Sequence, residues 1–342
     1  MFRAEYAPCP KGPALAARPE SLIATPDLPP EPVAALLAAA LRRVRITDSM
    51  QYCYMPSGDW ETDATPAAWK PHDAVSFHIL AEGTCWLEMG GQRRTLRAGD
   101  IAAFPFGTPH RIGAGAGGPE IDPGGALPPG PWRETPVLRF GGGERVVRIL
   151  CGYVRCEALS FGPFRAALPE LVLVATAGGD DWLAPIVARI VTEVDAPQGG
   201  GTAILERLTE LALIEVLRRQ LLAEPRGTTG WLAAIRDPVV ARCLGLMHAD
   251  PARPWTVALL AREAGASRSV IAARFAARLG RTPMSYLRDW RLLLARERLA
   301  RADVSIGALA EESGYGSEAA FCRAFARATG CPPGAYRARM AG

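Results

Sequence analysis

The sequence predicts an α+β fold: a strand-rich domain, a helical segment and an all-α carboxyl-terminal domain. Three observations predict this order. Short alternating apolar segments, separated by glycine and proline turns, run from residue 46 to 156, as in a β-barrel or sandwich. Apolar residues recur at helical spacing from residue 182 onward. The last third contains an internal repeat of about fifty residues, which indicates a duplicated helical unit.

The composition excludes several classes of protein. With 342 residues, 49% of them hydrophobic and 22% charged, the chain is long enough for two domains and is not disordered as a whole. It has no stretch of about eighteen uncharged apolar residues and no apolar secretory signal near residue 1. We therefore expect a cytoplasmic protein with no membrane partner. The eight cysteines include no CxxC pair, so neither a disulfide scaffold nor a zinc knuckle is predicted.

The net charge of +4 is unevenly distributed along the chain. Residues 236–342 contain 17 arginines, no lysine and 9 acidic residues, a net charge of +8. The other 235 residues carry 22 basic and 26 acidic side chains, a net charge of −4. A basic carboxyl-terminal third is compatible with nucleic-acid binding, although solvated charged faces are common.

Prolines, apolar spacing and glycines predict the tail, the first helix and the first strands of the chain. Residues 1–32 contain eight prolines and little apolar periodicity, which predicts a mobile tail. Residues 33–44 have the spacing of a short amphipathic helix. Residues 74–80 alternate between two faces, as in a strand, and Gly90-Gly91 predicts a hairpin turn between two further strands.

The middle of the chain changes from strands to helices. Residues 113–134 hold seven glycines and five prolines, which predicts a long exposed loop. Residues 145–155 are predicted as the last strand, and 182–194 and 202–222 as two helices.

The second of these helices carries an apolar stripe, formed by Ile204, Leu208, Leu211 and Leu217. Such a stripe packs either against its own domain or against the same helix of a second subunit, and the sequence leaves both possibilities open. We expect a homodimer, with residues 166–228 as a helical linker and dimerisation segment.

Six residues of the carboxyl-terminal third recur fifty positions later. They are Ser267, Ile271, Phe275, Gly280, Pro283 and Tyr286, which recur as Ser317, Phe321, Phe325, Gly330, Pro333 and Tyr336. Each copy has the order of a helix-turn-helix: a hydroxyl residue that caps a helix, a small residue, a glycine at the turn, and a second helix. The expected caps are Thr256, Ser267, Ser305 and Ser317, and the expected turn glycines are Gly265 and Gly314. An ordinary helical bundle is the alternative, which two copies in register disfavour.

The stretch GYGSEAAFCRAFARATGCPPGAYR, residues 314–337, resembles the signature of the AraC/XylS family of bacterial transcription regulators. The resemblance covers about residues 236–340 and makes residues 236–342 the DNA-binding domain. It implies two helix-turn-helix units, joined by a long helix from Pro283 to Ala302, that enter successive major grooves of double-stranded DNA. It also implies promoter sites and RNA polymerase as partners, with activation as the expected effect.

Carried over by position, the resemblance implies base-reading residues on the second helix of each unit. They are Ser269, Ala272 and Ala273 in the first unit, and Glu318, Ala319, Cys322 and Arg323 in the second, where Ser317 precedes them as the cap. Phosphate contacts are expected from Arg268, Arg274, Arg298 and Arg323. Relatives often have a long polar or basic residue at position 273, so the alanine here leaves more of the DNA contact to Arg268 and Arg274.

Residues 99–110 read G-x5-P-x-G-x2-H, which resembles the second motif of the cupin superfamily. The first motif is partial, because His78 and Glu82 have suitable spacing but Ser76 stands where a histidine is usual. The resemblance implies a jelly-roll β-barrel over residues 33–165. In regulators that combine a cupin with an AraC unit, the barrel is the sensing domain.

Four residues are expected to face one effector pocket: His78, Glu82, His110 and Cys151. A metal held by His78, His110 and Cys151 is one interpretation, since such donors suit Fe, Mn, Ni or Zn. Purely structural histidines are another, and a metal-free pocket for a small molecule is the one we favour. The ligand set is one histidine short, so no cofactor is predicted. His72 is a further histidine of this region.

Some regulators of this subgroup respond to reactive chlorine through cysteines, and Cys85 and Cys151 fall in stretches that recur among them. The expected effector is therefore a small molecule or an oxidant. A buried cysteine is usually a small apolar residue, and a redox role requires a lowered pKa. The alternative from another class is a cupin metalloenzyme of the dioxygenase kind with a helical appendage, which the repeat and Ser76 disfavour.

Overall fold

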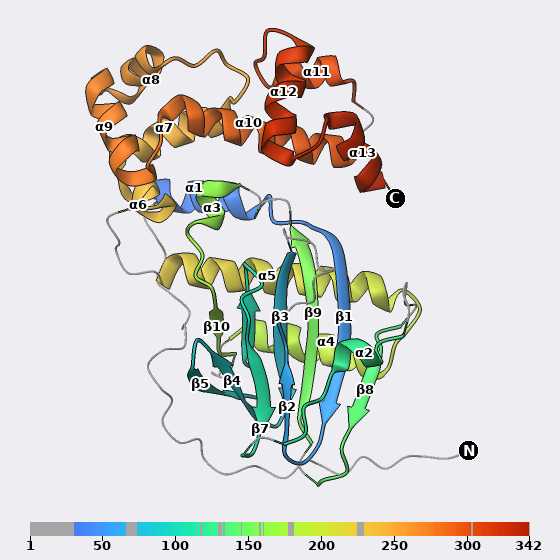
Figure 1. Cartoon of the computed structure of the whole chain (residues 1–342). Coiled ribbons are helices and arrows are strands. Elements are labelled where there is room, and N and C mark those ends of the chain that lie inside the picture. The colour runs from blue at the N-terminus through green and yellow to red at the C-terminus, as the bar shows by residue number, and fades with distance from the viewer. Residues whose placement is uncertain are drawn as a thin grey trace.

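The computed structural model describes residues 31–65, 74–116, 118–128, 132, 134–144, 146–156, 159, 161–176, 181–223, 229–301 and 304–341. Residues 1–30, most of the expected tail, lie outside this part of the chain, as does His72. Figure 1 shows a β-domain of two sheets, two long helices beside it, and a helical carboxyl-terminal domain at one end. The predicted α+β order is confirmed.

Six strands form the larger sheet, in the order β10-β6-β3-β9-β1-β8. Their bounds are β1 Ile46–Pro56, β3 Ala74–Glu82, β6 Ile101–Phe104, β8 Val137–Phe140, β9 Arg148–Cys156 and β10 Val172–Val174. Neighbouring strands are antiparallel except β1 and β8, which run parallel.

Four antiparallel strands form the smaller sheet, in the order β2-β7-β4-β5. Their bounds are β2 Trp60–Asp63, β4 Thr84–Met89, β5 Gln92–Arg97 and β7 Arg111–Ala114. The predicted hairpin is confirmed, because Met89 pairs with Gln92 and the two glycines between them have φ of +57° and +75°. Glycine adopts these angles without the steric cost that a side chain brings.

Five helices belong to the amino-terminal part of the chain. They are α1 Glu31–Leu41, α2 Pro123–Ala126, α3 Gly162–Arg165, α4 Leu183–Asp195 and α5 Gly201–Ala223. Helices α4 and α5 pack together along one face of the larger sheet (Figure 1). Among the described residues, no helix combines the length and apolarity needed to cross a membrane.

Eight helices form the carboxyl-terminal domain. They are α6 Trp231–Arg236, α7 Pro238–Ala249, α8 Val257–Ala264, α9 Arg268–Leu279, α10 Pro283–Arg301, α11 Ile306–Glu312, α12 Glu318–Thr329 and α13 Pro333–Ala341. The two predicted helix-turn-helix units are α8 with α9 and α11 with α12. The long helix α10 joins them.

The central strand β3 is buried on both faces, so its alternate residues lie in two different buried environments. Val75, Phe77 and Ile79 contribute to the apolar core shared with α5, whereas His78 and Leu80 point into the space between the two sheets. The alternation expected for residues 74–80 is therefore present. It places one histidine inside the barrel.

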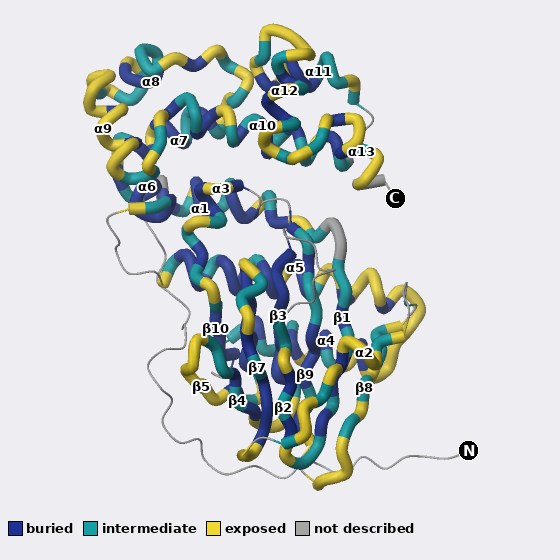
Figure 2. Tube along the Cα trace, viewed as in Figure 1, coloured by how far each residue is buried: buried dark blue, intermediate teal, exposed yellow. Residues whose placement is uncertain are grey.

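Three apolar clusters hold the chain together, and Figure 2 shows the buried residues along the inner faces of its helices and strands. One cluster fills the space between the sheets. A second extends from the outer face of the larger sheet through α1 and α5 to the first helix-turn-helix unit. Within it the Phe161 ring packs edge-on to Tyr286 and Trp290 of α10, at 5.4 Å between ring centroids in both pairs. The third cluster joins the second unit to α10 and α13 and includes no residue before α10.

Two expectations about segments are corrected. The last strand of the β-domain is β10, inside the segment predicted as helical linker, because its partner β6 lies about seventy residues earlier and pairing over that distance has no local signal. The glycine-rich segment 113–134 contains the short helix α2, whose buried Pro123 follows the capping carboxylate of Asp122.

The structure shows which side of α5 packs on its own domain. The side of α5 that packs on the sheet carries Leu213 and Val216, whereas Ile204 and Leu211 are 40% and 46% exposed. Only Leu217 of the predicted stripe is buried. Three charged residues of this helix are also buried: Glu210, which pairs with Arg45 at 2.6 Å, and Glu215 and Arg219, which pair with each other at 2.7 Å. Side-chain pairing of two opposite charges is what permits their burial.

Candidate nucleic-acid interface and effector pocket

The helix ends of both helix-turn-helix units follow the sequence prediction. The side chains of Thr256, Ser267, Ser305 and Ser317 each accept a hydrogen bond from a backbone amide in the first turn of the helix they precede. Gly265 and Gly314 have φ of +65° and +69° at the turns. These caps and glycines fix where each second helix begins.

The second helix of the first unit, α9, buries one narrow face. Ile271 and Phe275 are fully buried, while Arg268, Ser269, Ala272 and Ala273 are exposed. The Ser269 hydroxyl lies 3.0 Å from that of the capping Ser267. An exposed face of small side chains allows the helix backbone to approach the floor of a groove closely.

Helix α12 repeats this arrangement with one difference. Glu318, Ala319 and Arg323 are exposed, whereas Cys322 is half-buried and packs against the core of the second unit. Ser317 uses its hydroxyl to accept from the amide of Ala320, so its role is capping.

The arginines expected to contact phosphate fall into two groups. Arg274 pairs with Asp237 at 3.0 Å, and Arg298 pairs with Glu312 at 3.2 Å. Within the described part of the chain, neither Arg268 nor Arg323 has an ion-pair partner. The last two are therefore available to phosphate or base edges without breaking an internal ion pair.

Asp237 is a residue that sequence reasoning missed. Burial alone would raise its pKa, but hydrogen bonds from Arg274 and from the amides of Val240 and Val239 hold the pKa below its ordinary value. Its carboxylate caps α7 and ties the start of that helix to α9. The Asp-Pro pair at 237–238 is a helix-start signal that could have found the cap, but not the pairing with Arg274.

Inside the barrel, three of the four expected pocket residues meet. Cys151 of β9 lies opposite His78 of β3 and Tyr52 of β1 in the sheet. His78 Nδ1 is 3.1 Å from Cys151 Sγ, and His78 Nε2 is 2.8 Å from His110 Nε2. All three of these residues are almost fully buried.

When both imidazoles are neutral, these contacts determine which atom donates and which atom accepts in each hydrogen bond. The Thr108 carbonyl can only accept, so His110 Nδ1–H donates to it at 2.7 Å and His110 Nε2 is an acceptor. His78 must then donate through Nε2, which leaves its Nδ1 to accept from the Cys151 thiol. Tyr52 hydrogen-bonds to the sulfur from the other side. The His110 ring also stacks on Phe104 with 3.6 Å between centroids.

The same geometry tests the metal interpretation. A shared metal requires donor atoms that point to one place, but the two ring nitrogens of His78 face Cys151 and His110 on different sides of the ring. Among the described residues, no group of three or more histidine, cysteine and acidic side chains is arranged to hold a metal. The three residues do not fit the metal site considered from the sequence.

Glu82 does not join the pocket. It is exposed at the end of β3, opposite Arg148 across the sheet and beyond a register shift after Leu80. Four residues along a strand span about 13 Å, which is too far for Glu82 to reach the partners of His78. Strand spacing therefore removes it from the pocket.

The two candidate redox cysteines do not have reactive surroundings. Burial raises the pKa of the Cys85 thiol to about 12, and burial raises the pKa of Cys151 well above its ordinary value. A reactive thiol needs a lowered pKa and access to solvent. Both cysteines therefore have the character of buried structural thiols.

A cavity of about 130 Å³ lies beside His78 and Cys151. Its remaining walls come from β1, β2 and β9 and from α2. They include Tyr52, Asp63, Thr65, Ser76, Asp122 and Tyr153. Of these side chains the sequence singled out only Ser76 of β3, because the others are brought together by strand pairing and by the loop that carries α2. The hydroxyl of Ser76 is buried and has no hydrogen-bond partner among the described residues.

Comparison with known proteins agrees with this organisation. A family model described as cupin matches residues 35–221, and one described as helix-turn-helix domain matches residues 260–339. An AraC-like transcription regulator of Streptomyces lividans is 36% identical over 272 residues, which cover 77% of this chain and 86% of that protein. The RCS-specific HTH-type transcriptional activator RclR of Escherichia coli is 26% identical over 279 residues, 79% of this chain and 88% of that protein. Among solved structures, the DNA-binding domain of AdpA in complex with a target DNA is 31% identical over 30% of this chain and 92% of its own, with a TM-score of 0.29.

Proposed function

Because the chain belongs to the AraC family of helix-turn-helix transcription regulators with an amino-terminal cupin domain, we propose that α9 and α12 read promoter DNA under the control of a ligand in the cupin barrel. The relatives are transcription regulators, not enzymes. The metalloenzyme alternative is therefore not retained.

One observation carries the DNA-reading part of the proposal. Each unit presents a capped helix that buries only its aromatic or aliphatic face, Ile271 and Phe275 in α9, and Phe321 and Phe325 in α12. The opposite faces are exposed and made mostly of small side chains, with an unpaired arginine at each. Such faces fit the width and depth of the DNA major groove.

Replacing Arg323 by alanine is expected to weaken binding to the chain's own upstream DNA by about 1–3 kcal/mol, the usual loss when an arginine–guanine contact is removed. Fluorescence anisotropy with labelled upstream and random duplexes measures this loss. Binding to random DNA is expected to change much less, because sequence-independent affinity comes from phosphate contacts.

The matched control is Arg93→Ala, which removes an exposed arginine that lies over Trp86 in the smaller sheet. It is expected to leave both affinities unchanged. Equal losses on upstream and random DNA for Arg323→Ala would make this arginine a phosphate contact. No loss on either duplex would contradict its place in the interface.

For the effector, we propose a small molecule beside His78 and Cys151. Three features support this: the cavity between the sheets, the unpartnered Ser76 hydroxyl, and the ordered donors and acceptors around His78. The raised pKa values of the thiols favour a reversible ligand over an oxidant. Activation and contact with RNA polymerase are part of the same proposal, supported by the name of the Escherichia coli relative.

His110→Phe is expected to abolish the response to the effector while leaving basal DNA affinity intact. Phenylalanine keeps a ring that can stack on Phe104, but it removes the nitrogen that accepts from His78. A reporter fused to the target promoter, compared between non-inducing and inducing growth conditions, measures the response. A normal response from a stably folded His110→Phe chain would show that the histidines are structural.

The proposed homodimer is formed through the exposed side of α5. Ile204 and Leu211 lie two helical turns apart, with the half-buried Leu208 between them. A line of apolar side chains left in solvent on a long helix is typical of a helix–helix contact. Sedimentation velocity of the full chain tests this, and a monomer at all concentrations would contradict it.

A further inference from the structure

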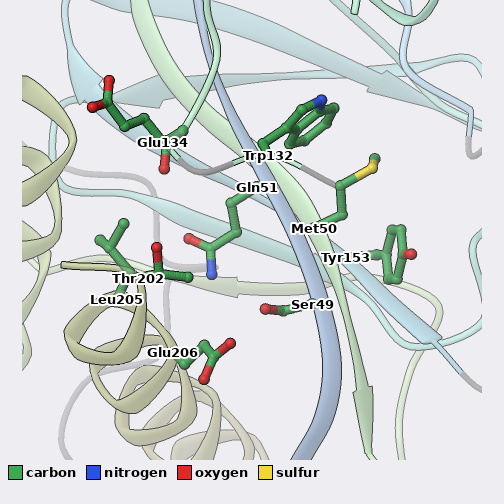
Figure 3. A pocket seen from close by; sticks show the side chains of 10 residues that line it. Ser49, Met50, Gln51, Trp132, Glu134, Tyr153, Thr202, Leu205 and Glu206 are labelled. Carbon is green, nitrogen blue, oxygen red and sulfur yellow. The ribbon is translucent and has the colours of Figure 1, made fainter. Parts of the chain in front are cut away.

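A second and larger cavity, of about 350 Å³, lies outside the barrel (Figure 3). Its walls come from four segments distant in the sequence: residues 49–51 of β1, residues 132 and 134–135 that lead into β8, Tyr153 of β9, and the first turns of α5. It shares only Met50 and Tyr153 with the cavity beside His78. Nothing in the proposed DNA-reading function uses it.

Two of the described residues that line this cavity are charged, and both are acidic: Glu134 and Glu206. Within the described part of the chain, neither carboxylate has an ion-pair partner. Two carboxylates at one cavity, neither of them neutralised by an ion pair with a described residue, create a negative potential that attracts a cation.

The apolar walls include aromatic side chains, which also attract cations. Trp132 and Tyr153 contribute aromatic rings, and Met50 contributes a polarisable thioether. The indole Nε1–H of Trp132 donates to the carbonyl oxygen of Pro128 at 2.8 Å, which restrains the ring. Aromatic faces attract organic ammonium groups, and tryptophan does so most strongly.

A buried amide adds a requirement for a hydrogen-bond donor. Gln51 is only 8% exposed, and its Nε2 donates to the Thr209 hydroxyl at 2.9 Å. Its Oε1 is buried and accepts no hydrogen bond from any described residue. Figure 3 shows this amide between Thr202 of α5 and the β1 strand. A buried carbonyl oxygen without a hydrogen-bond partner is unfavourable, and a donor on a ligand would remove this cost.

We propose that this cavity binds a primary organic ammonium compound with an apolar tail. An ammonium group both supplies donors to the Gln51 carbonyl oxygen and carries the charge that Glu134 and Glu206 favour. The tail lies against Trp132 and Met50. The same two carboxylates disfavour organic anions, and a neutral alcohol lacks the charge.

Isothermal titration of the full chain with three phenyl probes of similar size tests this proposal. The probes are 2-phenylethylammonium, 2-phenylethanol and 3-phenylpropionate, all at one ionic strength. The ammonium is expected to bind at least about tenfold more tightly than the alcohol, as expected for charge-assisted hydrogen bonds, and the carboxylate is expected not to bind. Equal binding of ammonium and alcohol, preferred binding of the carboxylate, or no binding of the ammonium would each overturn it.

Substitutions of the lining residues test whether the ammonium compound binds in this cavity. The double variant Glu134→Gln/Glu206→Gln keeps the shape and is expected to weaken ammonium binding about tenfold. Gln51→Leu is expected to weaken it as well, with thermal denaturation as a check that this buried position still permits folding. The control Glu170→Gln removes an exposed carboxylate that does not line the cavity and is expected to change nothing. Unchanged ammonium binding in the double variant would overturn the proposal.

Discussion

Phe325→Ala is expected to unfold the second helix-turn-helix unit while the rest of the chain stays folded. Phe325 is fully buried, and its ring packs edge-on to Tyr336 at 5.4 Å between centroids. Truncating a buried phenylalanine costs about 3–5 kcal/mol. The cluster that contains it includes only side chains from α10 onward, so the loss falls on the second unit.

Hydrogen–deuterium exchange measured along the chain distinguishes local from global unfolding. In Phe325→Ala, α11, α12 and α13 are expected to lose protection while α5 and the larger sheet keep it. Specific DNA affinity is expected to fall to the level of random DNA. Loss of protection throughout the chain would contradict the separation of the two cores.

The matched variant in the first unit is Phe275→Ala. Phe275 occupies the corresponding position of the repeat, but it belongs to the cluster that continues into α1, α5 and the outer face of the larger sheet. Its loss is expected to lower protection on both sides of the domain boundary. The same substitution at equivalent positions therefore has local consequences in one unit and wide ones in the other.

Acidification between about pH 6.5 and pH 5 is expected to lower the stability of the folded chain through His248, a residue of α7. The His248 ring stacks on Trp290 with 3.8 Å between centroids, and Nε2 lies 3.0 Å from the Tyr286 hydroxyl. Burial, and then the charge of Arg43, lower the pKa of His248 to about 3. In the unfolded chain this histidine takes a proton near its ordinary pKa of about 6.5.

The unfolded state therefore binds more protons than the folded state between these two pKa values, and stability falls as the pH falls through that window. The loss is at most about 1.4 kcal/mol per pH unit, or about 2 kcal/mol between pH 6.5 and pH 5. Urea denaturation at half-unit steps of pH measures it. His248→Phe keeps an aromatic ring beside Trp290 but cannot be protonated, so its stability is expected to change much less over this range. Equal slopes for the two proteins would contradict the assignment to His248.

The parts of this protein that could be predicted from its sequence are those whose cause is local. A hydroxyl at Ser267 or Ser317 caps the helix that begins at the next residue, and Gly90-Gly91 closes a turn between strands that are adjacent in the chain. The repeat of apolar residues fifty positions apart likewise describes two units that each fold over a short range. These signals were sufficient for α9 and α12 and for four of the ten described strands, β3, β4, β5 and β9.

Predictions failed where a side chain depends on a distant partner. Glu82 has the right spacing in the sequence for the pocket, but a strand carries it away from His78. The sequence also left open what the stripe on α5 packs against, because only the sheet that this helix covers selects Leu213 and Val216 and leaves Leu211 in solvent.

The sequence by itself therefore determined the order of domains, the helix-turn-helix pair and the surface that α9 and α12 present, because helix caps, turns and apolar spacing act over a few residues. Only the tertiary structure decided that His78, Cys151 and His110 form one chain of contacts, that Arg274 is paired with Asp237 and that β1, β8 and α5 enclose an acidic cavity. Those arrangements depend on register between strands and on packing between segments far apart, and no short-range pattern in a single sequence records them.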